Sequence, residues 1–576
     1  MLTHTPSGRT VRFGEMIGRA AKVKLAVEPE PKERSQWTFL SKQHPGKIQN
    51  PDVVNGTLIY GIDVRLPNMV FAALRQSPVQ GGTLKSFDAD AVKGMPGVLA
   101  VVAVRPKENL PTDQKTPIPM DRNAAQHAVA VIAEHYWQAR TALDALPVEW
   151  DDGPGARWKT TEQMNDAVTQ AIDKTGSKVE MSVGDTDAGF KAAHKIVEAT
   201  YHTPFCEQSP LEPLNGTALV TKDRVDVWPP TQHTLNAFYV AADETGLAPE
   251  NVYIHQTYVG GAFGRRIFCD DVRMVVAIAK QLPGRPVHTI WSREEQHRQG
   301  RYRSMLGGKF KVGLGADGLP TTLLARESGG PGFSVSGLVD SAFPQVVPNV
   351  QIESQVVPFH ILTGPYRGPG YNSNAFFVES LLDECALAAG IDPMDYRLKV
   401  YGKWADPGWV KCLHEVREKS GWGQPLPKGQ GRGVAVANWA MRGKPNAGTT
   451  VATVAKVEVK EGKLRILQID VAFDSGRIFN EEAVRVEMEG GTLFGLNIKN
   501  GQIVEGNFDV YPMLRMANAP RVINVHFGGL SDYPRYVEIG EPPAGTIGPA
   551  IANAVFQATG KRMRSTPFRL HDLSWA

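Results

Sequence analysis

A carboxylate held between a glycine and two prolines is the first candidate for chemistry. The stretch reads Ile539-Gly540-Glu541-Pro542-Pro543. Gly540 allows a close backbone approach, and the two prolines restrict the backbone after Glu541, so the carboxylate is positioned rather than free to sample rotamers. A positioned carboxylate suits a general base. The alternative is a loop carboxylate that caps or pairs locally.

A glycine-rich turn with two arginines lies between a predicted strand and a predicted helix. It comprises Gly260, Gly261, Ala262, Phe263, Gly264, Arg265 and Arg266. Backbone N–H groups at a helix start can bind an anion, and arginine adds bidentate phosphate donors. Val259 stands where a G-x-G-x-x-G fingerprint needs glycine, and no Walker A lysine follows. The turn therefore predicts either a phosphate-compatible site of another kind or a purely structural connection.

Other polar residues lie on stiff loops. The loop Tyr366-Arg367-Gly368-Pro369-Gly370 presents a cation before a predicted helix, and Gln232 follows a strand that ends in Trp-Pro-Pro. Each is also compatible with an ordinary turn. A basic cluster comprises Arg293, His297, Arg298, Arg301 and Arg303. It fits phosphate or partner binding, or a solvated charged face.

The net charge and the absence of certain motifs exclude several classes of function. The net charge of +3 and the pI near 8.5 are too mild for nucleic-acid binding. Ser336 stands where a G-x-S-x-G elbow starting at Gly332 needs glycine, and there is no H-E-x-x-H.

No apolar run reaches the length of a membrane span, and the N-terminus has no export signal. The cysteines are Cys206, Cys269, Cys385 and Cys412. Their spacing provides no zinc site, iron–sulfur cluster or disulfide framework.

The surrounding elements alternate between strand and helix patterns, which predicts an α+β chain of several domains. The early elements are strands over 57–64, 69–74, 128–133 and 147–150, with a helix through 137–143. The later ones are strands over 225–228 and 252–258, a helix capped by Asp270, a helix that Gly390 ends, a connector over 403–433, a hairpin turning at 461–463, and a helix that Pro549 opens and Gly560 ends.

Taken in order, these elements resemble the molybdenum-binding subunit of the xanthine dehydrogenase and aldehyde oxidase superfamily. The branch of isoquinoline 1-oxidoreductase β subunits and membrane-associated aldehyde dehydrogenases of acetic acid bacteria is the most similar. The matching stretches are TLIYGIDVRLPNMVFAAL, HAVAVIAEHYWQARTALDALPVEWDDG, WPPTQHT, VGGAFGRR, GPYRGPGYNSNAFFVESLLDE, EGGTLFGL, NFDVYPMLRM and IGEPPAGTIGPAIANAVFQATGKR. Their ordered co-occurrence is far more specific than any one of them.

The resemblance implies an α+β fold in which an α/β hammerhead domain precedes a large two-part molybdopterin-binding domain. The expected divisions are 1–44 for a linker or remnant of an N-terminal region, 45–155 for the hammerhead, and 156–430 and 431–576 for the two parts of the molybdopterin-binding domain.

The resemblance also implies roles for single residues. Glu541 would remove a proton from the metal-bound hydroxyl, Gln232 would hydrogen-bond an oxygen ligand of molybdenum, and Arg367 would line the metal and substrate side. The cofactor-binding residues would be Gly260, Gly261, Ala262, Phe263, Gly264, Arg265, Tyr366, Gly368 and Gly540. No side chain of this protein would ligate the metal.

The implied reaction is the oxidation of aldehydes to carboxylic acids with water as the oxygen source. The implied cofactor is molybdenum-molybdopterin cytosine dinucleotide, whose pyrophosphate would meet the arginines of the turn. Because this chain lacks cluster-forming cysteines, 2Fe–2S clusters are expected on a partner subunit. Two alternatives remain open: hydroxylation of an N-heteroaromatic carbon of the isoquinoline or nicotinate type, and a non-catalytic truncated or assembly subunit.

Further expectations concern partners and location. Family members carry a large N-terminal region with a Met-Gly-Gln-Gly segment, and often a twin-arginine leader, before the point where this chain starts. The expected partners are a small-molecule substrate, an iron–sulfur subunit, a polypeptide that supplies the N-terminal region, and a cytochrome c subunit as a further candidate. The expected location is the bacterial periplasm or the periphery of the inner membrane through partners, or alternatively the cytoplasm. The interval between Phe494 and Asn507 is shorter than in the family.

Overall fold

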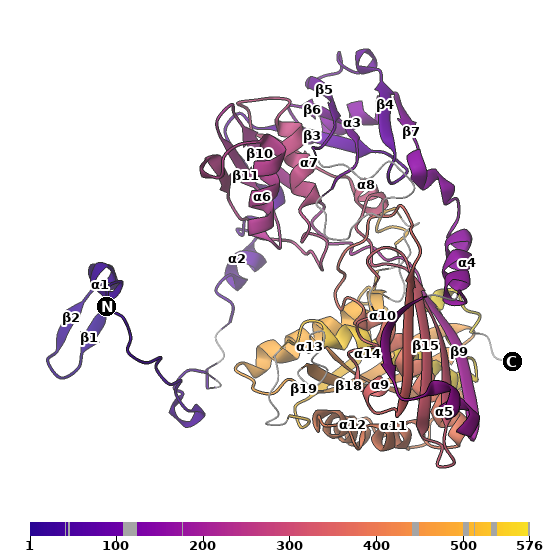
Figure 1. Ribbon diagram of the computed structural model, residues 1–576. Helices are drawn as coiled ribbons and strands as arrows, with labels where there is room; N and C mark the ends of the chain where they lie inside the picture. The colour runs from indigo at the N-terminus through magenta and orange to yellow at the C-terminus, as the bar shows by residue number, and fades with distance from the viewer. Residues whose placement is uncertain are drawn as a thin grey trace. The chain divides into compact units, whose positions relative to one another are not determined.

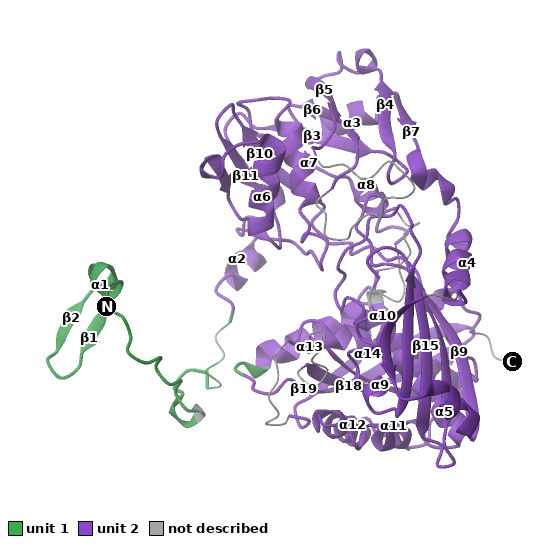
Figure 2. Cartoon of the chain, in the orientation of Figure 1, with its two compact units in different colours: residues 1–46, 479–481 green, residues 47–478, 482–576 purple. Residues whose placement is uncertain are grey.

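The computed structural model describes residues 1–40, 42–43, 46–107, 124–174, 177–333, 335–439, 448–498, 506–511, 513–530 and 538–573. It divides into two compact units, coloured separately in Figure 2. Unit 1 comprises Met1–Gly46 and Phe479–Glu481, and unit 2 comprises Lys47–Ile478 and Glu482–Ala576. The expected end of the linker at residues 44 and 45, and most of the shortened interval before Asn507, lie outside the described residues.

Unit 1 contains little secondary structure. Its elements are β1 (Leu2–His4), β2 (Arg9–Val11), α1 (Phe13–Ala20) and η1 (Arg34–Gln36). The Trp37 and Phe479 rings lie 5.4 Å apart and connect the two segments of the unit. No residue of α1 is buried, so this helix contributes nothing to a hydrophobic core.

Among the described residues of unit 2, a seven-stranded sheet forms the first layer (Figure 1). In spatial order its strands are β12 (Val252–Ile254), β11 (Val225–Trp228), β10 (Asn215–Val220), β13 (Val287–Ile290), β3 (Val70–Gln76), β6 (Ala128–Ala133) and β5 (Val98–Val104). Strand β3 pairs with β6 on one side and with β13 on the other. Strands of the expected hammerhead region therefore share a sheet with strands from beyond residue 155.

Helices cover both faces of this sheet because its central strands are apolar on both sides. Strand β6 is buried along its whole length, as its continuous apolar run predicts. Ala130 and Ile132 pack with α6 and α7, whereas Val129 and Val131 pack with α3. The helices and small elements here are α2 (Asn50–Asn55), η2 (Gly61–Asp63), β4 (Thr83–Phe87), η3 (Ala89–Ala91), α3 (Tyr136–Ala145), β7 (Val148–Asp151), η4 (Gly153–Arg157), α6 (Thr234–Thr245), η5 (Pro249–Asn251) and α7 (Asp270–Ala279).

The predicted strand over 57–64 is wrong. Its middle forms the 3-10 helix η2, and Tyr60 makes an isolated bridge to Tyr258. A Cβ on Gly61 would lie 2.5 Å from the ring of Pro230. Pro230 has no N–H that could pair with a strand at Gly61. The segment around Gly61 is therefore held by close packing rather than by strand pairing.

A five-stranded sheet forms the second layer. Its order is β8 (Lys178–Val183), β16 (Asn349–Val356), β15 (Pro320–Gly329), β14 (Leu306–Leu314) and β9 (Lys195–Thr203). The helices that pack on it are α4 (Thr161–Ile172), α5 (Thr186–Ala192) and α10 (Tyr371–Ala389). Helix α10 ends at Gly390, whose φ of 68° lies in the left-handed region, as predicted.

A four-stranded sheet follows, in the order β17 (Gln430–Trp439), β18 (Thr449–Lys460), β19 (Lys463–Asp474) and β20 (Val522–His526). The β18–β19 hairpin confirms the predicted turn at 461–463. Helix α14 (Pro542–Thr559) lies on β17 and β18 and also packs against α10. Side chains of both sheets and both helices join in one hydrophobic core, which makes the chain α+β as predicted.

The remaining elements of the described residues are shorter or peripheral to these sheets. They are α8 (Arg293–Arg298), α9 (Ala342–Gln345), α11 (Pro393–Tyr401), α12 (Gly408–Lys419), α13 (Glu481–Ile498) and η7 (Phe568–Leu570). No helix in the described ranges combines the length and the apolar character needed to cross a membrane.

Three predicted boundaries are wrong. The region 403–433, expected as a connector, contains α12 and the start of β17. The strand expected over 252–258 is shorter. Helix α14 starts at Pro542, and Pro549 lies inside it. The two prolines after Glu541 occupy the first helical turn, where a missing N–H removes no intrahelical hydrogen bond.

Gly433 on β17 allows α14 to approach the sheet. A Cβ there would lie 2.2 Å from the Ala550 carbonyl oxygen and 2.2 Å from the Ala554 nitrogen. We expect Gly433→Ala to lower the free energy of unfolding by about 1–3 kcal/mol, because the added methyl group must displace the helix. Differential scanning calorimetry would show a lower midpoint. The control is Gly490→Ala on α13, which has no neighbour within 4 Å; equal midpoints for the two variants would contradict this packing.

Candidate active site

The glycine-rich turn after β12 folds tightly and leaves backbone donors free. Gly261, Phe263 and Gly264 have positive φ angles of 103°, 54° and 102°. Among the described residues, the N–H groups of Gly261, Ala262 and Phe263 find no acceptor. Successive free N–H groups in such a conformation form a concave site for an anion or an oxygen-rich group. We call these three N–H groups the N–H cradle.

Gln232 holds the turn closed from the preceding loop. Its Oε1 accepts the Gly264 N–H at 3.1 Å and the Arg266 N–H at 3.3 Å. Its own backbone N–H donates to the Arg266 carbonyl oxygen at 3.1 Å. These contacts fix the carboxamide, and its Nε2 has no acceptor within the described part of the chain. Gln232 is therefore an oriented donor beside the N–H cradle.

A second loop, over 364–370, contacts the turn. Gly264 lies so close to Pro365 that a Cβ would be 2.2 Å from the Pro365 carbonyl oxygen. The Arg367 backbone N–H donates to the Phe263 carbonyl oxygen at 3.1 Å. The loop and the turn therefore form one surface.

Glu541 reaches the same surface from the start of α14. The Gly368 N–H donates a hydrogen bond to Glu541 Oε2. The Arg367 Nε donates to the neighbouring Gly540 carbonyl oxygen at 2.6 Å. In the described ranges, Glu541 Oε1 has no partner. The carboxylate is thus fixed through one oxygen and available through the other.

The environment shifts the acidity of this carboxylate. Burial raises the pKa of Glu541 above its ordinary value, and the nearby Glu538 and Glu487 carboxylates add to the increase. The Gly368 N–H and the Arg367 guanidinium oppose the shift because they stabilise the charged form. A carboxylate with a raised pKa is a stronger base once ionised, which suits proton abstraction.

Two residues of α13 complete the site, and neither was predicted from the sequence. Glu487 accepts the Arg367 Nη2 at 2.6 Å. The Phe494 ring lies 4.6 Å from that of Phe263, 5.4 Å from that of Tyr366 and 5.3 Å from the Arg367 guanidinium. Glu487 and Phe494 are seven positions apart and so share a helix face. That spacing is the signal that could have identified them.

Glu212 is a third residue of the site that was not predicted from the sequence. Its carboxylate accepts the Gly260 N–H at 2.7 Å, the Ile62 N–H at 3.0 Å and the Asn215 Nδ2 at 3.0 Å. It therefore anchors the start of the turn to β10. Glu212 lies between Leu211 and a proline. Like Glu541, it directly precedes a proline, and that restricted setting could have identified it.

The two arginines of the turn are internal. Arg265 is 2% exposed, and its two Nη atoms donate to Asp270 at 3.0 Å each. Arg266 is 0% exposed and donates to three backbone carbonyl oxygens. Their guanidinium groups are thus engaged inside the protein, so this geometry does not support the expected contact with a pyrophosphate. We assign Arg265 and Arg266 to the support of the turn.

The ion pair of Arg265 also explains a wrong prediction about α7. Asp270 was expected to cap this helix, but it is the first helical residue and Cys269 is the cap. The Asp270 carboxylate is engaged by Arg265 and by the Arg301 Nε at 2.8 Å. It is therefore not available to the N–H groups of the helix.

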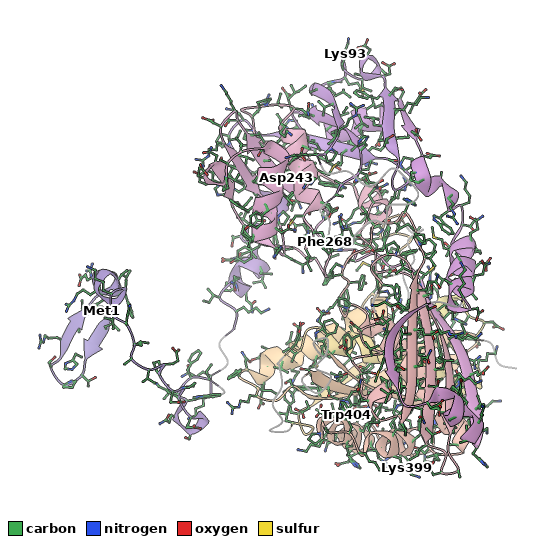
Figure 3. All side chains as sticks on the ribbon, viewed as in Figure 1. Met1, Lys93, Asp243, Phe268, Lys399 and Trp404 are labelled. Carbon is green, nitrogen blue, oxygen red and sulfur yellow. The ribbon has the colours of Figure 1, made fainter. Side chains whose placement is uncertain are left out.

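The basic cluster after β13 is largely buried rather than a solvated face. His297, Arg301 and Arg303 are exposed by 1%, 1% and 6%. The Arg301 guanidinium lies 4.9 Å from the ring of Phe268, which Figure 3 labels. Arg298, in contrast, is exposed. Most of this cluster therefore supports the interior.

The predicted site residues come together from four segments of the chain. Those in mutual contact are Phe263, Gly264, Tyr366, Arg367, Gly368, Gly540 and Glu541, with Gln232, Gly260, Gly261, Ala262 and Arg265 in or against the same turn. In the described ranges, no group of three or more His, Cys, Asp or Glu could hold a metal ion. The N–H cradle and the Gln232 donor instead fit an oxygen-rich cofactor that carries its own metal, as molybdopterin does.

A family model agrees with this geometry. The model described as "Molybdopterin cofactor-binding domain" matches residues 169–401. That span contains Gln232, the glycine-rich turn and the loop over 364–370, and it ends before Glu541.

Whole-chain comparisons extend the similarity. The chain is 27% identical over 587 residues to isoquinoline 1-oxidoreductase subunit beta of Brevundimonas diminuta, covering 93% of this chain and 69% of that protein. It is 25% identical over 624 residues to the membrane-bound aldehyde dehydrogenase (pyrroloquinoline-quinone) of Gluconacetobacter polyoxogenes, covering 98% and 77%. The fold matches that of an aldehyde oxidoreductase from Desulfovibrio gigas with a TM-score of 0.72 and 17% identity, over 90% of this chain and 79% of that chain.

Gly264→Ala tests whether the contact between the turn and the loop over 364–370 is needed for the cofactor. The substitution adds a Cβ against the Pro365 carbonyl oxygen, so the two segments should separate. We expect about tenfold less bound molybdenum per chain, which corresponds to a small loss of binding free energy, measured by inductively coupled plasma mass spectrometry. Gly284→Ala has a similar φ of 81° with nothing within 4 Å and should retain the metal. Full molybdenum content in Gly264→Ala would contradict the role of this contact.

Proposed function

Because this chain belongs to the molybdenum-binding subunits of the xanthine dehydrogenase family and is an oxidoreductase, we propose that it oxidises aldehydes to carboxylic acids with water as the oxygen source. The observation that carries this proposal is the Glu541 carboxylate, which is held through Oε2 and available through Oε1 on the surface that the N–H cradle forms.

Glu541 acts as the general base in this proposal. When bound, the molybdenum cofactor would supply an activated oxygen derived from water and accept two electrons from the substrate. Glu541 would take the proton through Oε1, while the Gly368 N–H keeps Oε2 in place. The orientation of the carboxylate is thus set before the reaction, which lowers the cost of reaching the transition state.

Arg367 and a set of aromatic rings maintain the environment of the base. The Arg367 guanidinium joins the Gly540 carbonyl oxygen to Glu487, and its side chain is 15% exposed. Tyr366 and Phe494 pack with Ala544 in the first turn of α14. This apolar packing limits the water around Glu541 and is consistent with its raised pKa.

The N–H cradle and Gln232 would hold the cofactor. The three free N–H groups offer donors to its oxygen atoms, and Gln232 Nε2 offers a donor to an oxygen ligand of the metal. The cytosine dinucleotide form of the cofactor belongs to this proposal through the resemblance of the sequence.

Electron transfer would require other chains. The four cysteines are buried and form no disulfide, and their wide spacing does not suit a cluster. We therefore propose that the 2Fe–2S clusters lie on a partner subunit, with a cytochrome c subunit as a further proposed partner. A position in the periplasm, at the periphery of the bacterial inner membrane, is consistent with the membrane-bound relative.

Hydroxylation of an N-heteroaromatic carbon is the second candidate function. It is favoured by the relative named isoquinoline 1-oxidoreductase subunit beta, and it would use the same base and the same cofactor contacts. A non-catalytic assembly subunit is less well supported, because a scaffold has no use for an available base, an oriented Gln232 donor and a free N–H cradle in one place.

Glu541→Gln is the direct test of the proposed base. The amide can still accept the Gly368 N–H, but it cannot take a proton. We expect turnover to fall by about 10²- to 10⁴-fold with an unchanged molybdenum content. Glu538→Gln is the matched control, because Glu538 lies three residues earlier and accepts from the Trp439 indole instead. Normal turnover in Glu541→Gln would refute the assignment.

The pH profile of the same variants gives a second readout. In the wild-type enzyme, kcat/KM should rise with pH as Glu541 loses its proton. The midpoint of this rise should lie above the ordinary pKa of glutamate, because burial raises the pKa of Glu541. The rise should be absent from Glu541→Gln and retained in Glu538→Gln.

The native complex allows the function classes to be separated. We expect it to contain molybdenum, to release a cytidine nucleotide on denaturation, and to reduce a dye acceptor faster with aldehydes than with N-heteroaromatics. Faster dye reduction with isoquinoline or nicotinate would establish the second candidate. A complex without molybdenum and without the nucleotide would favour the assembly subunit.

A further inference from the structure

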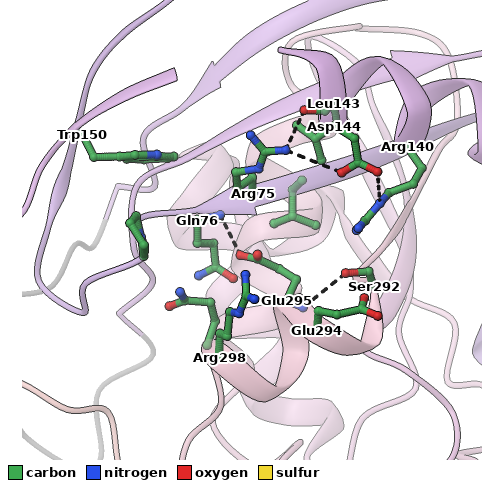
Figure 4. A pocket seen from close by; sticks show the side chains of 13 residues that line it. Arg75, Gln76, Arg140, Leu143, Asp144, Trp150, Ser292, Glu294, Glu295 and Arg298 are labelled. Atoms are coloured by element: carbon green, nitrogen blue, oxygen red, sulfur yellow. Dashed lines mark hydrogen bonds and ion pairs between the residues drawn. The ribbon is translucent and has the colours of Figure 1, made fainter. Parts of the chain in front are cut away.

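A separate cavity of about 260 Å³ lies between β3, α3 and α8 (Figure 4). Leu74, Leu143 and Trp150 contribute an apolar part of its lining, and Arg75 and Arg298 contribute charge. None of the residues assigned to the proposed active site lines it. The proposed function therefore leaves this cavity unexplained.

One side of the cavity carries two arginines that share a single carboxylate. The Arg140 Nε donates to Asp144 at 2.9 Å, and the Arg75 Nη2 lies 3.6 Å from Asp144. The Arg75 Nη2 also donates to the Leu143 carbonyl oxygen at 2.8 Å. Figure 4 shows these three charged side chains along one side of the cavity. This side carries one more positive than negative charge.

The opposite side is formed by α8. Glu295 is 8% exposed and accepts the Gln76 N–H at 2.7 Å. Burial raises the pKa of Glu295 to about 7, although the Arg75, Arg298 and Arg140 guanidinium groups that face it act in the opposite direction. Near neutral pH this acid therefore holds its proton for part of the time.

Arg298 is the unusual member of this lining. It is exposed, and no described residue forms a hydrogen bond or an ion pair with it. Glu294 on the same helix also lines the cavity and adds a negative charge to its lining. With Glu295 protonated, the lining has three arginines against Asp144 and Glu294, so a single negative charge would neutralise it.

We propose that this cavity binds a small organic monocarboxylate, with its carboxylate near Arg298 and Arg75 and its apolar body against Leu143 and Trp150. Arginine is the side chain best suited to bind a carboxylate through two hydrogen bonds. The apolar lining favours an organic body over a bare inorganic ion. The volume, slightly below that of sites for drug-sized ligands, fits a compact molecule. This binding is independent of the proposed oxidation.

Binding should depend on pH because of Glu295. Below about pH 7 the acid is neutral, and above it the ionised carboxylate repels a bound anion. The affinity for a carboxylate should therefore fall as the pH rises through this range.

Isothermal titration calorimetry of the full-length chain with benzoate tests the proposal. We expect saturable binding at pH 6, weaker binding at pH 8, and weaker binding of the uncharged benzamide. Arg298→Gln should reduce the affinity for benzoate at pH 6 by about tenfold, since one charge-assisted contact is lost. No described residue forms a hydrogen bond or an ion pair with Arg298, so the thermal midpoint should stay unchanged.

Three further variants locate the binding. Arg465→Gln removes an exposed arginine on β19, which does not line the cavity, and should bind benzoate like the wild type. Glu295→Gln should bind benzoate equally at both pH values. Arg367→Gln should also retain binding, because Arg367 belongs to the proposed active site.

Several results would overturn the proposal. They are the absence of saturable benzoate binding, equal affinity in Arg298→Gln and wild type, or loss of binding in Arg367→Gln with retention in Arg298→Gln. Tighter binding of inorganic phosphate than of benzoate would overturn the carboxylate class. None of these results bears on the turnover lost in Glu541→Gln, so the two proposals can fail separately.

Discussion

The packing of α10 against α14 sets the geometry on which the candidate site depends. Helix α10 starts at Tyr371, directly after the loop over 364–370, and α14 starts at Pro542, directly after Glu541. The helices are close enough that a Cβ on Gly545 would lie 3.7 Å from the Tyr371 carbonyl oxygen. Both belong to the main core, so the core, rather than the two loops, fixes the distance between the base and its N–H donor. The dipole of α14 also favours the ionised form of Glu541 and so opposes the effect of burial.

Buried charges hold these helices in register. Glu379 on α10 is 1% exposed and pairs with Arg397 on α11 at 2.7 Å. The Glu379 carboxylate also accepts the Val436 N–H of β17 at 2.9 Å, and its carbonyl oxygen accepts the Asn553 Nδ2 of α14 at 3.2 Å. Glu379 therefore connects four elements behind the site, and the Arg265–Asp270 pair connects the turn to α7. Such pairs specify an arrangement more than they stabilise it, because the desolvation of both charges offsets their attraction.

The sequence predicted structure well where local chemistry decides the backbone. Gly390 ends α10, residues 461–463 turn the hairpin, and the apolar run of β6 is buried, all as expected. Prediction from the sequence failed where a contact between distant segments decides the backbone conformation. Gly61 packs on Pro230 instead of joining a strand, and the helical spacing of the buried α12 residues was hidden among glycine, proline and lysine.

The candidate site divides in the same way. The segments that carry Glu541, Gln232 and Arg367 have unusual local compositions, and the structure brings them together. Glu487 meets Arg367 across 120 residues of sequence, so the helix face that it shares with Phe494 is its only local signal, and no unusual composition marks it. Arg265 is the opposite case. The motif around it predicted a phosphate contact, whereas its buried guanidinium pairs with Asp270, and burial is a property of the fold rather than of the motif.

Strands from distant parts of the chain share one sheet, so the sheet cannot be completed early during synthesis on the ribosome. Strand β3 pairs with β6 early, but its other neighbour, β13, provides Val287 opposite Val70. Until residue 290 has emerged, the growing polypeptide presents β3 with an unsatisfied row of N–H and C=O groups, which is a template for aggregation. We therefore expect the first strands to be shielded, by a chaperone or by compact non-native contacts, until β13 has emerged. The N–H cradle lies between β12 and β13 in the chain, so it is synthesised before this delayed pairing can be completed.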